Sequence, residues 1–197
     1  MWVRAVTGPE PARWEGGWLS GARAVPSPNF GPRPGAERPS LLVLHSISLP
    51  PGVFGGPEIE ALFTNCLDCS AHPSFEALRG LEVSAHFLIR RDGELLQFVS
   101  ADERAWHAGK SSFRGRERCN DFSLGVELEG LEGGVFDERQ YLALGRLLPQ
   151  LRERYPLEAV VGHEHIAPGR KADPGPGFDW LRLRQDLGWE AQLFPFV

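Results

Sequence analysis

The amino-acid sequence predicts an α/β fold in which a mixed central β-sheet is packed by helices in a single domain. Short apolar runs typical of strands recur along the chain, as at residues 40–46 and 122–128. Residues 137–155 have the apolar spacing of an amphipathic helix. A hairpin lies among these elements. Strands interleaved with helices and hairpins are typical of a mixed sheet covered by helices.

The first half of the chain contains three of these elements. Residues 40–46 (SLLVLHS) form a continuous apolar run, which predicts a buried central strand ending near His45. Residues 57–63 suit a short helix that begins with a proline. In residues 82–99, side chains alternate on the first arm and an Asp-Gly pair follows, which predicts a hairpin with a tight turn.

A second strand is predicted where the sequence reads DFSLGVELEG. Its apolar residues Phe122, Leu124, Val126 and Leu128 alternate with small or acidic ones. Glu127 therefore points to the face that carries small side chains, where there is room for a ligand.

The last elements are a long helix, a strand and a second helix. The helix at residues 137–155 is expected to be capped by Asp137 and kinked by Pro149. Residues 158–163 (EAVVGH) indicate a final short strand, and residues 178–187 indicate a C-terminal helix.

The N-terminal part is predicted to differ from the rest. Residues 1–16 are expected to be a tail, and residues 17–197 to form the domain. The first segment of that domain, to about residue 39, is rich in proline and is expected to wrap around it in an extended form.

Composition excludes several classes of partner. The formal net charge of −5 argues against nucleic acid, which needs a basic face. No apolar run reaches the length of a membrane span, and no apolar signal-peptide region stands near the N-terminus. The three cysteines, Cys66, Cys69 and Cys119, are typical of a reduced protein. We therefore expect the protein to be cytoplasmic. We also expect it to be a monomer.

One group of polar residues could carry chemistry. His45 and His163 each stand at the end of an apolar strand, and Asp173 follows on a proline-stiffened loop. Two imidazoles and a carboxylate can hold zinc with a fourth position open, and zinc lowers the pKa of a bound water to about 7. Glu127 could move protons, and Lys171 could stabilise a developing oxyanion.

Spacing alone leaves other interpretations open. His45 could be a core histidine and His163 a loop residue, since no short zinc motif is present. His165 is nearer to Asp173 in the sequence and could be the ligand instead. His86 suits packing or hydrogen bonding better than ligation.

The segment CLDC, followed by His72, could form a second metal site or a redox pair. A structural or incidental role is favoured, because Cys66 and Cys69 have no second cysteine pair and no βαβ context surrounds them.

Several long segments resemble the AmpD-type amidases. The similar segments cover roughly residues 18–186 and include SLLVLHSISLPPGVFGG, VSAHFLIRRDGELLQFV, RAWHAGKSSFRGRERCNDFSLGVELEG and GHEHIAPGRKADPGPGFDW. These zinc enzymes cut 1,6-anhydro-N-acetylmuramyl-L-alanine in cell-wall recycling and have the peptidoglycan-recognition/amidase fold. The resemblance implies that His45, His163 and Asp173 bind zinc, that Glu127 is the catalytic acid/base, and that Lys171 stabilises the oxyanion.

The resemblance also bears on substrate contacts. Arg118 matches a family arginine expected to meet a peptide carboxylate, for which a guanidinium is well suited. Ser46 stands where the family often has Asn, and Glu82 where it often has Arg, so a charge is reversed near the expected substrate rim. Trp106 and His107 either line a sugar or peptide groove or belong to the core.

These observations predict a cytoplasmic zinc amidase that acts on anhydro-muropeptides. One rival is a general amidase of intact cell wall, which would have to be exported. Another is a non-catalytic muropeptide-binding module of the same fold. Such modules typically lose a zinc ligand, whereas His45, His163 and Asp173 are all present here.

Overall fold

The computed structural model describes residues 13–35 and 37–197. Its centre is a six-stranded sheet with the strand order β12-β5-β11-β6-β7-β3. The strands are β3 (Arg23–Ala24), β5 (Leu41–Ile47), β6 (Phe87–Ile89), β7 (Leu95–Gln97), β11 (Ser123–Glu129) and β12 (Ala159–Gly162). The first four strands in this order run parallel, β7 is antiparallel to β6, and β3 is parallel to β7. The predicted mixed sheet is confirmed.

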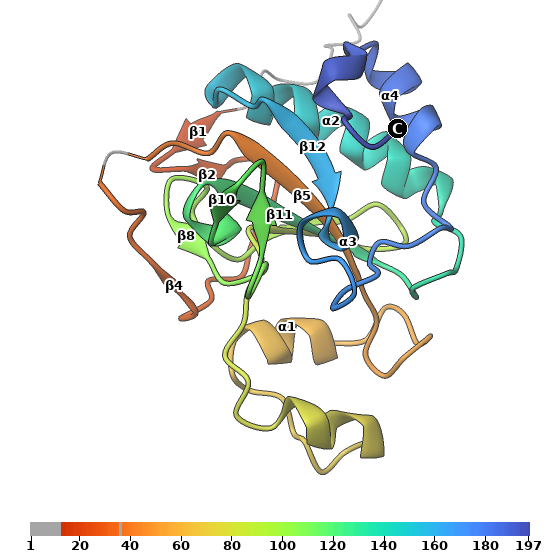
Figure 1. The fold of residues 1–197 in the computed structure, drawn as a ribbon. Coiled ribbons are helices and arrows are strands. Elements are labelled where there is room, and N and C mark those ends of the chain that lie inside the picture. The colour runs from red at the N-terminus through yellow and green to blue at the C-terminus, as the bar shows by residue number, and fades with distance from the viewer. Residues whose placement is uncertain (1–12, 36) are drawn as a thin grey trace, which may run out of the picture.

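Helices lie on both sides of this sheet. The α-helices are α1 (Glu58–Phe63), α2 (Glu138–Arg154), α3 (His163–Ile166) and α4 (Trp180–Leu187), and the 3₁₀ turns are η1 (Pro73–Leu78), η2 (Cys119–Asp121) and η3 (Ala191–Leu193). Figure 1 shows α2 and α4 together on one side of the sheet and α1 on the opposite side. Among the described residues, no helix is both long enough and apolar enough to cross a membrane.

Outside the main sheet, the described residues form three pairs of short strands. They are β1 (Trp14–Glu15) with β2 (Trp18–Leu19), β4 (Phe30–Gly31) with β8 (Arg104–Ala105), and β9 (Ser112–Phe113) with β10 (Arg116–Glu117). The proline-rich segment therefore does more than wrap the domain. It supplies β3 at the edge of the main sheet and β4 beside β8.

The larger hydrophobic core lies between the sheet and helices α2 and α4. Its sheet residues include Leu42, Leu44, Phe87, Ile89, Leu124, Val126 and Leu128, and α2 adds Tyr141, Leu144, Leu147, Leu148 and Leu151. Each fully buried aliphatic or aromatic side chain stabilises the fold by roughly 1.5–3 kcal/mol. The alternation predicted for β11 is confirmed for Leu124, Val126 and Leu128, whereas Phe122 lies before the strand and packs in another core. The apolar stripe predicted for α2 is confirmed.

Helix α2 begins as the sequence predicts. The carboxylate of Asp137 accepts a hydrogen bond from the Arg139 amide, and the Gln140 side chain accepts one from the Asp137 amide, so a capping box is formed. Pro149 lies inside the helix on its exposed side, and the helix continues to Arg154.

The other face of the sheet carries two smaller cores. One packs α1 and η1 against the sheet and includes Ile59, Phe63 and Phe75. The second lies near α3 and includes Val43, Phe122 and Ile166. His45 and Glu127 stand at the end of this same face, since they alternate with the residues of the larger core along β5 and β11.

The predicted hairpin is shorter than its sequence pattern. Only Phe87–Ile89 and Leu95–Gln97 pair as strands, although the antiparallel arrangement is confirmed. Before β6, isolated backbone hydrogen bonds, such as that from the His86 amide to the Gly125 carbonyl, and side-chain contacts are found in place of a regular ladder. The Ser84 hydroxyl donates to the carbonyl of Asn29, and His86 Nδ1 accepts from the amide of Gly125 at 2.9 Å.

The predicted boundary between a tail and a domain falls partly outside the described residues, which begin at residue 13. Trp14 and Glu15 already pair with Leu19 and Trp18, and the Trp14 ring lies at 6.4 Å from that of Tyr155. The division into residues 1–16 and 17–197 stays a prediction.

Candidate active site

The site begins with a row of side chains across three neighbouring parallel strands. In the sheet register, Glu127 of β11 is paired with His45 of β5, and Gly162 of β12 is paired with Leu44. His163 follows Gly162 directly and begins α3. Paired residues of parallel strands point to the same face, so His163, His45 and Glu127 come to one edge of the sheet. This edge is formed by the carboxyl ends of the strands, where ligands often bind in α/β proteins.

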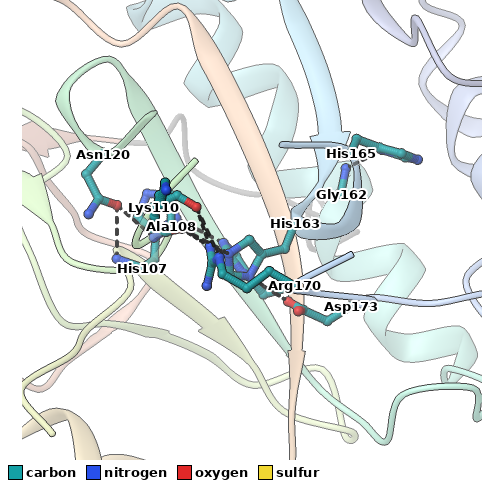
Figure 2. A network of polar contacts seen from close by, with 10 residues as sticks. His107, Ala108, Lys110, Asn120, Gly162, His163, His165, Arg170 and Asp173 are labelled. Carbon is teal, nitrogen blue, oxygen red and sulfur yellow. Dashed lines mark hydrogen bonds and ion pairs between the residues drawn. The ribbon is translucent and has the colours of Figure 1, made fainter. Parts of the chain in front are cut away.

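Asp173 reaches this row from the loop that follows α3. The Glu164 amide donates to the Asp173 backbone carbonyl at 2.9 Å, which holds the loop against the start of α3. Asp173 Oδ2 lies 3.1 Å from His45 Nδ1 and 3.1 Å from His163 Nδ1, and the two Nδ1 atoms lie 3.0 Å apart. All three side chains are buried. Figure 2 shows His163 and Asp173 directed toward one another.

The protonation of His163 tests whether these three atoms fit a cation. His163 Nε2 lies 3.1 Å from the carbonyl oxygen of Ala108, which only accepts, so Nε2 carries the hydrogen. In the neutral ring, Nδ1 then presents a lone pair to Asp173. Burial lowers the pKa of His45 to about 4, so the ring of His45 is neutral near pH 7. Two lone pairs and a carboxylate oxygen therefore face one another.

Such a donor set suits a metal ion. Nitrogen and carboxylate ligands lie about 2.0–2.2 Å from zinc, and atoms 3.0–3.1 Å apart can share one ion at that distance. His45, His163 and Asp173 form the one group of three potential ligands found among the described residues. The contact with the two imidazoles holds the pKa of Asp173 well below its usual range, although burial opposes this effect.

Glu127 stands beside this group without belonging to it. Its Oε2 atom is buried and has no hydrogen-bond partner in the described part of the chain. Burial, together with the negative charge of Asp173, raises the pKa of Glu127 well above its usual value. A buried carboxyl group with a raised pKa is typical of a residue that both accepts and donates protons.

Lys171 contributes charge from the rim of the site. It is exposed, and its amide donates to the Ala167 carbonyl in the turn that follows α3. Its positive charge lowers the pKa of both His45 and Glu127, so it lies near both groups. The interaction of Lys171 with a developing negative charge stays a prediction.

A cavity of about 410 Å³ adjoins the site and contains Arg118. Two further cations, Lys110 and Arg170, line it together with Glu117. Arg170, which lines the cavity, donates to the Ala108 carbonyl at 2.8 Å. His163 contacts the same carbonyl oxygen, so the cavity lies next to the metal-binding group. Figure 2 shows Arg170 beside Ala108 and His163. A cavity with an excess of positive charge suits a ligand with carboxylates.

The structure distributes the other predicted contact residues around this centre. Ser46 follows His45, and its buried Oγ has no hydrogen-bond partner among residues 13–35 and 37–197. Trp106 is partly exposed, and its amide donates to the Ser84 hydroxyl oxygen at 3.0 Å. Glu82 lines a different cavity, of about 170 Å³, and not the one that contains Arg118.

His165 is separated from the metal-binding group. Its Nδ1 accepts a hydrogen bond from the Gly162 amide at 2.8 Å, and its ring stacks on Phe196 with centroids 4.3 Å apart. Figure 2 shows its ring directed away from His163 and Asp173. The interpretation of His165 as an alternative partner of Asp173 is therefore not supported by the geometry.

The cysteines lie apart from the site. Cys66, Cys69 and Cys119 are all free, and none belongs to the potential metal-binding group of the described residues. Cys66 is exposed and its Sγ contacts the carbonyl of Thr64. This agrees with an incidental role for the CLDC segment.

Sequence reasoning missed the layer of residues behind the two histidines. Asn120 Oδ1 accepts hydrogen bonds from the amides of His107 and Ala108, and Arg170 donates to the carbonyls of Ala108 and Lys110. These contacts hold residues 107–110 against the site (Figure 2). No local pattern signals them, because each joins segments distant in the chain.

Comparison with known proteins places the chain in a family. Residues 35–176 match the family described as N-acetylmuramoyl-L-alanine amidase. The chain is 58% identical over 170 residues to the 1,6-anhydro-N-acetylmuramyl-L-alanine amidase AmpD of Citrobacter freundii. This alignment covers 85% of this chain and 91% of the Citrobacter protein.

Solved structures agree with this result. A crystal structure of a selenomethionine derivative of AmpD superposes with a TM-score of 0.86 at 56% identity, covering 88% of this chain and 98% of that one. AmpDh3 from Pseudomonas aeruginosa, in complex with anhydromuramic pentapeptide, superposes with a TM-score of 0.57 at 31% identity. The match covers 78% of this chain and 61% of the AmpDh3 chain. The chain therefore belongs to the N-acetylmuramoyl-L-alanine amidase family and, within it, is an enzyme of the AmpD type.

Proposed function

We propose that this enzyme is a zinc-dependent hydrolase of the amide bond between 1,6-anhydro-N-acetylmuramic acid and L-alanine. One observation carries the proposal. The ligand atoms of His45, His163 and Asp173 converge within 3.1 Å of one another, beside a buried carboxyl oxygen of Glu127 that has no hydrogen-bond partner among the described residues. A site for a Lewis acid thus stands next to a group able to move protons.

The relatives support the substrate. The similar protein from Citrobacter freundii carries the name of an amidase of 1,6-anhydro-N-acetylmuramyl-L-alanine, and the match extends over 91% of its length. AmpDh3 was solved with an anhydromuramic pentapeptide. We infer the same class of ligand for this enzyme, and with it a place in cell-wall recycling.

The proposed chemistry divides among zinc, Glu127 and Lys171. Zinc held by His45, His163 and Asp173 would polarise the substrate carbonyl and make water more acidic. Glu127 takes a proton from the attacking water at its carboxylate as the new C–O bond forms. Glu127 then gives this proton to the amide nitrogen, the C–N bond breaks, and L-alanine leaves as an amine. Lys171 stabilises the negative charge that develops on the carbonyl oxygen.

The adjoining cavity suits the peptide part of the substrate. Arg118 lines this cavity and is proposed to bind a peptide carboxylate, and Lys110 and Arg170 make the same cavity more positive. Ser46 and Trp106 are proposed to contact the substrate nearer to the cleaved bond. Glu82 lines a separate cavity and is not among the residues that line the one containing Arg118.

We propose further that the enzyme acts in the cytoplasm as a monomer, within a domain formed by residues 17–197. Three free cysteines are typical of a reducing compartment, and the net charge of −5 disfavours nucleic acid as a partner. No membrane partner is expected. Light scattering after size-exclusion chromatography tests the monomer, and removal of residues 1–16 with retained activity supports the boundary.

One assay separates this function from its two rivals. The zinc-loaded enzyme is incubated with an anhydro-muropeptide and, separately, with intact murein, and the products are identified by mass. We expect anhydro-muramic acid and free peptide from the first substrate, and much slower release from the second. Equal rates on both substrates would indicate a general amidase. Binding of the muropeptide without cleavage would indicate a non-catalytic module.

A further inference from the structure

A second histidine lies directly behind the proposed ligand His45. His45 Nε2, the nitrogen that faces away from Asp173, lies 2.9 Å from His107 Nδ1. His107 Nε2 lies 3.1 Å from the hydroxyl of Ser123. A chain of hydrogen bonds therefore runs from the metal-binding group through His45 and His107 to the start of β11.

The direction of the hydrogens along this chain follows from the metal site proposed above. If His45 Nδ1 binds a cation as a neutral ring, the hydrogen of His45 must be on Nε2. His45 Nε2 then donates to His107 Nδ1, and His107 carries its own hydrogen on Nε2 and donates to Ser123. Each of the two histidines is held in one tautomer.

The position of the His107 ring is closely confined. A Cβ atom at Gly125 would lie 2.5 Å from His107 Cγ, so the ring rests directly on the backbone of β11, which only glycine permits. The ring also meets that of His45 edge-on, with centroids 5.0 Å apart. The His107 amide is bound by Asn120 Oδ1 at 3.1 Å. The ring has little freedom to turn toward a substrate.

The same short segment holds the other histidine. Ala108 follows His107, and its carbonyl oxygen lies 3.1 Å from His163 Nε2. Residues 107 and 108 thus contact the outer nitrogens of both proposed histidine ligands. Such outer contacts fix the tautomer and the direction of a metal ligand.

We propose that His107 is a positioning residue for the metal site, which orients His45 and keeps its Nδ1 free for the cation. Sequence reasoning had offered His107 as a contact for the substrate. In the structure both of its ring nitrogens already have protein partners. The residue therefore acts through His45 and not on the substrate.

Two substitutions of the same residue test this role. In His107→Asn, the amide oxygen takes the place of Nδ1 and still accepts from His45, whereas His107→Phe keeps a ring of similar shape and accepts nothing. We expect His107→Phe to raise the Kd for zinc about 10–100-fold, measured by competition with a chelator, as for other outer partners of ligands. His107→Asn should stay within about threefold of the wild-type protein, because it keeps the contact with His45.

Two further variants separate positioning from packing. Gly125→Ala retains both histidines but displaces the His107 ring, and should raise the Kd for zinc as His107→Phe does. Ser123→Ala removes only the far end of the chain and should change the Kd less than His107→Phe. Thermal unfolding of each metal-free variant identifies any that fails to fold. Imidazole ¹⁵N spectra of the zinc-loaded wild-type enzyme should show His107 with its hydrogen on Nε2.

The outcomes distinguish this inference from the proposed function. A wild-type protein that binds no zinc overturns the metal site and the inference together. If the wild-type protein binds zinc and His107→Phe, folded, binds it equally well, only the role of His107 is overturned. The same holds if His107→Phe raises KM and leaves the Kd for zinc unchanged, because His107 would then contact the substrate.

Discussion

Replacing Glu127 by glutamine keeps the length of the side chain and removes its ability to take up a proton. The carboxyl group is not one of the three converging ligand atoms, so the Kd for zinc should stay close to that of the wild-type enzyme. The loss of a positioned acid/base should lower kcat about 100-fold or more. This loss corresponds to about 2.7 kcal/mol or more in the activation barrier. The assay is release of free peptide from an anhydro-muropeptide, followed by mass.

Although its kcat should fall, the metal-free Glu127→Gln variant should be at least as stable to unfolding as the wild-type protein. Burial raises the pKa of Glu127 above its usual value of 4.5, so the folded state holds the proton more tightly than the unfolded state. Ionisation of Glu127 therefore opposes folding as the pH rises above 4.5. Glutamine removes this cost. Thermal unfolding should show the variant at least as stable as the wild-type protein at pH 7, with no gain below pH 4.5.

Glu129 provides a matched control on the same face of the same strand. Its carboxylate accepts from the Arg90 guanidinium at 2.9 Å, and also from the amides of Gly55 and Arg91. Glu129→Gln removes the charge from these contacts and should lower the free energy of unfolding by about 1.5–3 kcal/mol. Its kcat should fall much less than that of Glu127→Gln.

Two results would refute this reasoning about Glu127. A Glu127→Gln enzyme with kcat within about threefold of the wild-type value would mean that another group moves the proton. Loss of zinc from the same variant would mean that Glu127 is itself a ligand and that the three-ligand site is wrong.

Three other predictions concern the ligands, the cavity and the cysteines. His163→Ala should lose its zinc in elemental analysis, whereas His165→Ala should keep it; the reverse pattern would assign the wrong histidine. Arg118→Ala should raise KM more than it lowers kcat, because the residue lies in the adjoining cavity and not beside Glu127; an unchanged KM would remove its role in binding. The double variant Cys66→Ser and Cys69→Ser should keep full zinc content and activity, and a loss of about half the zinc would reveal a second site.

Local patterns in the sequence were sufficient for most of the secondary structure. The apolar run that ends near His45, the alternation around Glu127 and the cap at Asp137 each depend on residues close together in the chain. Periodicity reports such local features directly. The same patterns overestimated the hairpin, because Ser84 and His86 bond to the distant residues Asn29, Trp106 and Gly125 and do not form part of a regular strand.

The candidate site required the resemblance to a family as well. Spacing alone left His165 as an alternative to His163 beside Asp173 and left His45 as a possible core residue. The resemblance to AmpD-type amidases selected His163, and the structure brings His163, His45 and Asp173 together. The roles of these residues in catalysis stay predictions.

By itself the sequence determined which residue types are available and which strands and helices carry them. It could not determine the register of β5, β11 and β12, which places His45 beside Glu127 and His163 next to both. It also gave no sign that His107 lies behind His45, or that the Ala108 carbonyl faces His163. These contacts join segments more than 50 residues apart, and their energies depend on distances that exist only after the sheet has assembled. Only the tertiary structure could therefore decide them.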